Sequence, residues 1–302
     1  MVSCPQLTGL HMACCWRLNM ASALLAAIGN QPFIASLKRL CIDVRQAGIT
    51  TELLTLAAET SSLEELLLPS ELVTIPTLQR LANAWQIDGC AQLKALTTSL
   101  STDLNLISTD TLALMGTTFP HLRKVGIGGI IQGPPPSVGY AFHHVQELNI
   151  GELFLPSLEH VYSSPALQTL LQSLVIACPV ITSFIFKAGM RSADYNDEAE
   201  PEAHLLPSPG DALCKLPQSL SCLSLTSIRL TQASLMPANL PNLKSIQFIA
   251  CGSAALALSE SLVALCPQLK LQRCCVGPTL ESAIDNGRER LGLPRLGFCC
   301  RL

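Results

Sequence analysis

Histidine and cysteine are the residue types of this chain that could bind a metal ion or act as nucleophiles. His143 and His144 stand next to each other, just ahead of Glu147, and together would offer two imidazoles and a carboxylate. Adjacent side chains of an extended segment point in opposite directions, so the two imidazoles would not converge on one ion. We therefore expect a solvated turn here, before Val145, and no metal site.

The cysteines also lack the spacing of a metal site. The chain has 14 cysteines but no Cys-x-x-Cys motif. The adjacent pairs Cys14-Cys15 and Cys274-Cys275 have no second pair at the separation that zinc sites use. We expect both pairs to serve in packing, because free buried cysteine behaves as a small apolar residue.

Three cysteines that precede a proline bear on the redox compartment. Cys4, Cys178 and Cys266 occupy equivalent places in units that are far apart along the chain, so they should not reach one another at disulfide distance. A chain with many free thiols indicates a reducing compartment, and we expect a cytoplasmic or nuclear protein.

Motifs of the common enzyme classes do not occur in the sequence. There is no Gly-x-Ser-x-Gly, no Gly-x-x-x-x-Gly-Lys and no His-Glu-x-x-His. The run Gly126-Ile-Gly128-Gly129 lacks the spacing of a dinucleotide-binding loop, and we expect it to fall within a strand. We predict that the chain is not an enzyme and has no cofactor.

The last four residues have the outline of a prenylation signal. Cys299-Cys-Arg-Leu302 resembles a C-terminal C-a-a-X box, with a terminal leucine that favours geranylgeranyl. Arg301 stands where an aliphatic residue belongs. Lipidation of Cys299 is therefore the weaker hypothesis, and a tail that covers the end of the fold is the stronger one.

Composition limits the classes of partner. The 302 residues are 14% charged, carry a net charge of −3 and have a mean hydropathy of +0.39. This charge gives no electrostatic basis for nucleic-acid binding. The most apolar run, residues 170–186, is interrupted by Gln172, Ser173 and Pro179, so we expect no transmembrane segment.

A sequence repeat predicts the strands and helices that must position any functional residue. A block of the form Leu-x-x-Leu-x-Leu recurs along the chain, and a fixed period of this kind is typical of a solenoid. Apolar residues at the first, fourth and sixth positions should fill the core of a short strand, and helical segments should follow at residues 51–59, 77–85, 165–177, 254–266 and 278–291. The blocks begin at Leu7, Leu37, Leu63, Leu93, Leu122, Val145, Ile181, Leu220 and Leu243, with a degraded copy at Leu269.

The first block resembles a known repeat class. Cys4-Pro-Gln-Leu7-Thr-Gly-Leu10-His-Met12, continued to Cys15, is similar to the cysteine-containing leucine-rich repeat, as found in the repeat region of F-box/leucine-rich-repeat proteins. The resemblance implies an α/β leucine-rich-repeat solenoid, or horseshoe, with a parallel concave sheet, convex helices and about ten repeats. The ninth position of such repeats carries Asn or Cys, whereas Arg45, Glu71, Ser101 and Ile130 stand there in this chain, which predicts an incomplete buried ladder.

Domain boundaries follow from the repeat. We expect the leucine-rich-repeat domain to span residues 4–293, with a tail at 294–302. Residues 188–211 contain six acidic side chains, a single arginine, Arg191, and three prolines. We therefore expect them to form an acidic loop insertion.

The predicted function is protein binding. A solenoid of this kind offers its concave face to a protein partner, through many side chains of mixed charge. Two alternatives stay open. The chain could be the substrate-recognition part of an F-box-type ubiquitin ligase, which would bind a ligase adaptor, although no F-box segment is expected in this chain. It could instead be a GTPase-activating repeat protein that uses Arg39 or Arg123. Strand alternation predicts these concave-face residues: His11, Arg39, Asp43, Glu65, Lys124, Glu147, Asn149, Lys187, Ser224 and Gln247.

Overall fold

The computed structural model divides the chain into two compact units, Met1–Val145 and Gln146–Leu302, and each unit is described by itself. The prediction about the tail at 294–302, with Cys299, lies outside the described residues, as do the helices predicted at 254–266 and 278–291 and the repeat at Leu269. The structure describes residues 7–13, 27–43, 50–99, 106–132, 139–154, 164–189, 211–226, 228, 230, 240–249 and 289.

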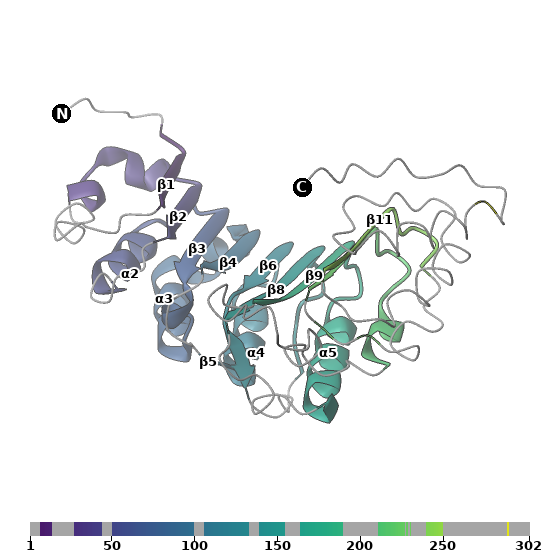
Figure 1. Cartoon of the computed structure of the whole chain (residues 1–302). Helices are drawn as coiled ribbons and strands as arrows, with labels where there is room; N and C mark the ends of the chain where they lie inside the picture. Colours follow the sequence, from purple (N-terminus) through teal and green to yellow (C-terminus); the bar gives the residue numbers. More distant parts are fainter. Residues whose placement is uncertain are drawn as a thin grey trace, which may run out of the picture. The chain divides into compact units, whose positions relative to one another are not determined.

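The first unit is built on parallel strands that pair in chain order, as Figure 1 shows. Each strand pairs with the strand of the next repeat, so that consecutive repeats lie side by side. The strands are β1 (Gly9–Ala13), β2 (Arg39–Asp43), β3 (Glu65–Pro69), β4 (Ala95–Ser99) and β6 (Lys124–Ile127).

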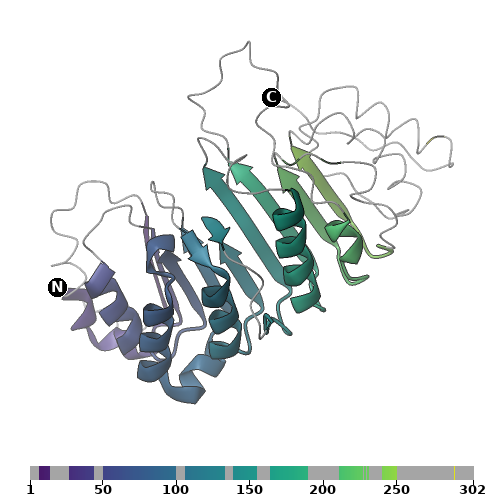
Figure 2. The ribbon, with the colours of Figure 1, turned by 90° about the horizontal axis from the view of Figure 1, so that it is seen from below.

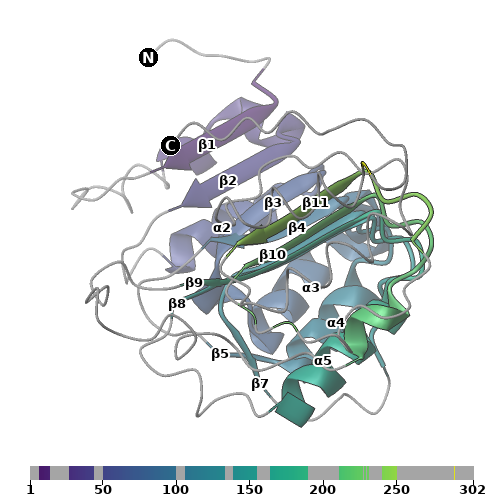
Figure 3. The same cartoon turned by 45° about the vertical axis from the view of Figure 1, so that its right-hand side comes forward.

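The second unit repeats the arrangement. Its strands are also parallel and in chain order, and the β8–β9 ladder has a register shift between Gly151 and Leu153. The elements are β8 (Glu147–Phe154), α5 (Ser164–Ala177), β9 (Ser183–Gly189), the short 3-10 helix η5 (Ala212–Lys215), β10 (Cys222–Thr226) and β11 (Ser245–Ile249) (Figure 3).

The repeat pattern of the sequence coincides with the strand register. Within each unit, the fourth position of each described block is aligned with the fourth position of the next, as Leu40, Leu66 and Leu96 are. These side chains are at most 2% exposed, and burying each leucine contributes roughly 1.5–3 kcal/mol. The buried residues at the first position are Leu37, Leu63, Leu93, Leu122 and Val145 in the first unit, and Ile181, Leu220 and Leu243 in the second.

Helices cover the buried face of the strands in the first unit (Figure 2). Side-chain oxygens cap two of them: Thr74 Oγ1 accepts from the Thr77 amide at 3.4 Å, and Ser108 Oγ accepts from the Thr111 amide at 3.0 Å. The elements on this side are the 3-10 helices η1 (Pro32–Ser36) and η2 (Ser70–Leu72) and the α-helices α2 (Thr50–Glu59), α3 (Ile75–Gln92) and α4 (Thr109–Thr118).

The three predicted helices that lie within the described residues are helical in the structure, and one of them is longer than predicted. Residues 51–59 and 165–177 match α2 and α5. Residues 77–85 are only part of α3, which continues past a break at Gln86 (φ 58°) to Gln92. Helix α4 was not predicted, since four of its ten residues are threonine and one is glycine, and both types have weak helix propensity. Burial of Leu112 and Met115, both at 0% exposure, overrides that propensity.

A small second sheet in the first unit was also not predicted. It pairs β5 (Leu106–Ser108) with β7 (Ile130–Gln132) in parallel, and it lies beside α4 on the helix side (Figures 1 and 3).

The structure describes only the two ends of the predicted acidic insertion at 188–211. Ala188 and Gly189 belong to strand β9. At the other end, Asp211 is fixed to α5, because its Oδ1 accepts from Gln168 Nε2 at 2.6 Å and from Gln172 Nε2 at 2.8 Å. Residues 190–210 lie outside the described residues.

Within the described ranges, no helix is both long enough and apolar enough to cross a membrane.

Candidate protein-interaction surface

The face of the strands opposite the helices carries side chains in rows that follow the register. We call the row just before the fourth position the first outward row, and the row between the fourth and sixth positions the second outward row. In the first unit the first outward row is Gly9, Arg39, Glu65, Ala95 and Lys124, and the second is His11, Cys41, Leu67, Thr97 and Gly126.

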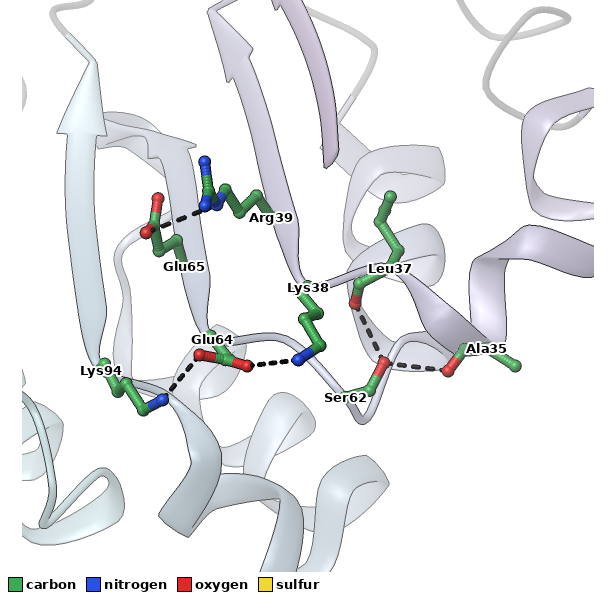
Figure 4. A network of polar contacts seen from close by, with 8 residues as sticks. All are labelled: Ala35, Leu37, Lys38, Arg39, Ser62, Glu64, Glu65 and Lys94. Atoms are coloured by element: carbon green, nitrogen blue, oxygen red, sulfur yellow. Dashed lines mark hydrogen bonds and ion pairs between the residues drawn. The ribbon is translucent and has the colours of Figure 1, made fainter. Parts of the chain in front are cut away.

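Opposite charges meet in the first outward row of the first unit. Arg39 Nε lies 3.6 Å from Glu65 Oε1, across the β2–β3 ladder (Figure 4). Both side chains are well exposed, so solvent weakens this ion pair and its contribution to stability is below about 1 kcal/mol. The stability of the fold therefore depends little on this pair.

The second outward row shows why a glycine stands in strand β6. A Cβ atom at Gly126 would lie 2.9 Å from Thr97 Cγ2, in the register partner on β4. Gly126 thus accommodates a crowded strand pair and lies in a strand as predicted, whereas Gly128 and Gly129 follow the end of β6 and lie outside a strand. The Thr98 hydroxyl also bonds both the amide and the carbonyl of Gly128.

In the second unit the outward face is polar but less open. Its first outward row is Glu147, Ser183, Cys222 and Ser245, and its second outward row is Asn149, Ile185, Ser224 and Gln247.

Ser224 corrects one prediction about this face. It was expected among the exposed residues, yet it is 4% exposed, because its small side chain lies between the longer Ile185 and Gln247 and its Oγ is 3.1 Å from Gln247 Oε1. Asn149 Oδ1 and Thr226 Oγ1 are also buried, and they have no hydrogen-bond partner among the described residues.

The ten predicted residues are spread over both units and over three rows. Arg39, Glu65, Lys124 and Glu147 lie in first outward rows, whereas Asp43 and Lys187 lie one residue beyond the sixth position. The backbone of Asp43 pairs with Ala13, and its side chain lies outside the described part. His11, Arg39, Glu65, Lys124 and Glu147 are exposed, Asn149, Lys187 and Gln247 are half-buried, and Ser224 is buried.

One edge of the strands holds polar residues that were not predicted. The strand-start edge consists of the residues just before and just after the first buried position of each repeat. There, one backbone carbonyl per repeat accepts two amides from the next repeat; the Glu64 carbonyl, for example, accepts from Lys94 N at 2.8 Å and Ala95 N at 3.0 Å. The same pattern occurs at the carbonyls of Thr8, Lys38, Lys94, Gln146, Thr182 and Ser221.

Side chains after the first position form a charged chain along this edge in the first unit. Lys38 Nζ lies 3.0 Å from Glu64 Oε1, and Lys94 Nζ lies 2.6 Å from Glu64 Oε2 (Figure 4). Hydrogen bonds from Lys94 and Lys38 lower the pKa of Glu64 to about 2. One carboxylate is thus shared by two ammonium groups, which leaves one positive charge in excess.

Side chains before the first position add hydrogen bonds between repeats. Ser62 Oγ donates to the carbonyls of Ala35 and Leu37, both at 2.9 Å, and Ser219 Oγ donates to the Ile181 carbonyl at 2.8 Å. The signal in the sequence was a Ser just before the first leucine of the block, which the consensus treats as variable.

In two repeats of the first unit, a histidine stands just before the first buried position. His121 and His144 are exposed, come from adjacent turns and have ring centroids 5.6 Å apart. Residues 143 and 144 form a turn, in agreement with the prediction. Across the described residues, no three His, Cys, Asp or Glu side chains are grouped so as to hold a metal ion.

The described cysteines are free thiols. Cys41, Cys90, Cys178, Cys214 and Cys222 form no disulfide. Burial raises the pKa of Cys178 to about 12, so this thiol stays protonated and unreactive at neutral pH. Its 0% exposure agrees with a role in packing.

No protein-family model matches the sequence, and no curated protein matches it.

Proposed function

We propose that this chain is a leucine-rich-repeat-type solenoid that acts as a non-catalytic binding module, and that it holds a protein partner on the outward face of its strands. The observation that supports the proposal most is the repeated carbonyl at the strand-start edge. Each such carbonyl accepts hydrogen bonds from two amides of the next repeat, which fixes the register of neighbouring strands. Outward side chains of successive repeats are therefore aligned in rows, spaced by the strand separation of about 4.8 Å.

The chemistry of the outward rows favours a protein. In the first unit they combine the exposed Arg39–Glu65 ion pair, the exposed Lys124 and His11, and the half-buried apolar side chain of Leu67. Protein interfaces combine an apolar centre with a polar rim in this way. Such a surface is pre-organised, since backbone ladders hold the strands, and less entropy is lost on binding.

The alternative reading as a substrate receptor of an F-box-type ubiquitin ligase uses the same face. It adds the claim that a ligase adaptor binds elsewhere on the chain. The reading as a GTPase-activating protein would use Arg39, which forms an exposed ion pair with Glu65, or Arg123, which is exposed and has no ion pair among the described residues; neither arginine lies in a setting that distinguishes this reading.

Copurification followed by mass spectrometry tests the proposal. The tagged full chain is compared with an outward-face variant, Arg39→Ala with Lys124→Ala, and with a helix-side control, Arg80→Ala with Glu59→Ala, whose side chains are also exposed. We expect a set of proteins that the wild type and the control retain and that the outward-face variant loses. Recovery of a ligase adaptor with the wild type and with both variants would favour the substrate-receptor reading, because that adaptor would bind outside the outward face.

Two results would overturn the proposal. One is that no protein is enriched with the wild type. The other is that both variants lose the same proteins equally, in which case the outward face is not the binding surface.

A further inference from the structure

The strand-start edge is charged in the first unit and neutral in most of the second. In both units, however, its backbone carbonyls make the same hydrogen bonds to the next repeat. After the first buried position, the second unit carries Thr182, whose Oγ1 donates to the Gln146 carbonyl at 3.1 Å, and Ser221, whose Oγ donates to the Thr182 carbonyl at 3.0 Å. The backbone ladder thus forms with small hydroxyl residues at this position. The charges of Lys38, Glu64, Lys94 and Arg123 at the equivalent places are therefore not required by the fold.

These charges do not balance. Glu64 is shared by Lys38 and Lys94, so this group has one excess positive charge. Arg123 follows in the next repeat; it is exposed, and no ion pair among the described residues includes it. The positive charge of the edge therefore rises from Lys94 to Arg123.

Histidines border the same end of the edge. His121 and Arg123 flank the buried Leu122, so both side chains face solvent. The His144 ring lies 5.6 Å from the His121 ring, centroid to centroid. The planar guanidinium of Arg123 can bind a carboxylate with two hydrogen bonds, and each imidazole offers a further N–H donor.

We propose that the strand-start edge of the first unit, from Lys94 through His121 and Arg123 to His144, binds an acidic segment of a protein partner. Lys94 and Arg123 belong to neighbouring repeats, whose strands are about 4.8 Å apart, a spacing that an extended peptide with closely spaced carboxylates can follow. Nucleic-acid binding usually rests on many phosphate contacts, whereas the excess positive charge at this edge comes from the Lys38–Glu64–Lys94 group and Arg123 alone among the described residues, so we commit to a protein segment as the occupant. The inference rests on the proposed function only in assigning the acidic segment to a protein partner.

A direct binding experiment tests it without a natural partner. A fluorescent synthetic peptide of alternating Glu and Ser is titrated with the full chain at low salt, and its anisotropy is compared with that of a Gln-Ser peptide of equal length. The variants are Lys94→Gln and Arg123→Gln. The matched control is Lys244→Gln, which removes an exposed lysine from the same repeat position in the second unit.

We expect the wild type to bind the Glu-Ser peptide and not the Gln-Ser peptide, with binding lost at high salt. Each test variant should weaken binding about 2- to 5-fold, and the control should leave it unchanged, because an exposed ion pair contributes below about 1 kcal/mol. Thermal unfolding of the variants checks that each still folds.

The inference is overturned if the Glu-Ser peptide does not bind or if Lys244→Gln weakens it as much as Arg123→Gln does. It is also overturned if a single-stranded oligonucleotide binds more tightly than the peptide and loses affinity in the same two variants. A partner that copurifies through the outward face while the peptide fails to bind would leave the proposed function standing and remove only this inference.

Discussion

Ser62 Oγ lies 2.9 Å from the carbonyl oxygen of Leu37, the first buried residue of the preceding repeat. The relationship recurs in the second unit, where Ser219 Oγ lies 2.8 Å from the carbonyl oxygen of Ile181. In both cases the serine comes just before the first apolar position of its own repeat. These hydroxyls tie one repeat to the next where the backbone turns into the strand.

Removing the Ser62 hydroxyl tests this bond. Ser62→Ala should lower the free energy of unfolding by about 1 kcal/mol, because the Leu37 and Ala35 carbonyls both lose a hydrogen-bond donor. Ser61→Ala is the matched control, since Ser61 is adjacent and exposed. Urea unfolding of the three proteins measures the difference, and equal stability of Ser62→Ala and Ser61→Ala would show that the bond contributes nothing.

Alanine substitutions at two glycines with positive φ distinguish the cost of backbone strain from the cost of steric overlap. Gly151 has φ +139°, and a Cβ atom there would overlap the Lys187 carbonyl oxygen and lie 2.7 Å from Lys187 Cβ. Gly139 has φ +70° with no atom within 4 Å of its added Cβ. Gly139→Ala should therefore show the strain alone, about 1 kcal/mol, and Gly151→Ala should cost at least about 2 kcal/mol more.

Thermal unfolding of the two glycine variants, followed by circular dichroism, measures the two costs. The β8–β9 ladder shifts register just after Gly151, so Gly151→Ala should also disturb that strand pair. A smaller effect at Gly151 than at Gly139 would contradict the close approach of β8 and β9.

Two buried aromatic residues should respond in opposite directions to loss of their polar group. Trp85 Nε1 donates to the Ala57 carbonyl at 2.9 Å, whereas the Tyr140 hydroxyl is buried with no hydrogen-bond partner among the described residues. Trp85→Phe should destabilise the fold by about 1–2 kcal/mol, because a hydrogen bond and packing are lost. Tyr140→Phe should be neutral or stabilising, because an unsatisfied hydroxyl leaves the interior.

Differential scanning calorimetry of these two variants and the wild type measures the change in the midpoint of thermal unfolding. Burial, and to a lesser degree the charge of Asp110, raises the pKa of Tyr140 to about 12. The ultraviolet titration of tyrosinate in the wild type should therefore include a late component that Tyr140→Phe lacks. A strong loss of stability in Tyr140→Phe would indicate that the hydroxyl is bonded after all.

The strands were predictable because their signal is local and repeated. Leu37, Leu40 and their equivalents are apolar at fixed spacing, and the parallel register follows when each block aligns with the next. Helices α2 and α5 were also predictable, since their apolar residues share one face. Helix α4 was not, because its formation depends on burial against residues distant in the sequence, such as Ala141, whose backbone lies 3.1 Å from a Cβ built on Gly116.

The surface was less predictable than the fold. Strand alternation correctly placed Arg39, Glu65 and Lys124 in one row of the first unit. It failed for Ser224, because burial of an outward side chain depends on the size of its neighbours on other strands. The charged chain through Glu64 was missed because each of its members belongs to a different repeat, and only the strand register brings them together.

Stability at acidic pH depends on Glu64. Its pKa in the folded state is lowered to about 2 by hydrogen bonds from Lys94 and Lys38, from an ordinary value of 4.5. A carboxyl whose pKa falls on folding stabilises the fold above its unfolded pKa, and this contribution is lost as the pH falls through the folded pKa. The window for Glu64 therefore runs from about pH 5 down to about pH 2.

Replacing this carboxylate should change the acid limb of the stability profile. Glu64→Gln should be less stable than the wild type above about pH 5, by less than about 1 kcal/mol, because the Glu64 side chain is 30% exposed and solvent screens the ion pairs. The difference should shrink as the pH falls toward 2, where the wild-type carboxyl becomes protonated as well. Urea unfolding across this range, repeated at high salt to screen the charges, measures it. A difference that stays constant with pH would mean that the ion pairs with Lys38 and Lys94 do not set the stability of this edge.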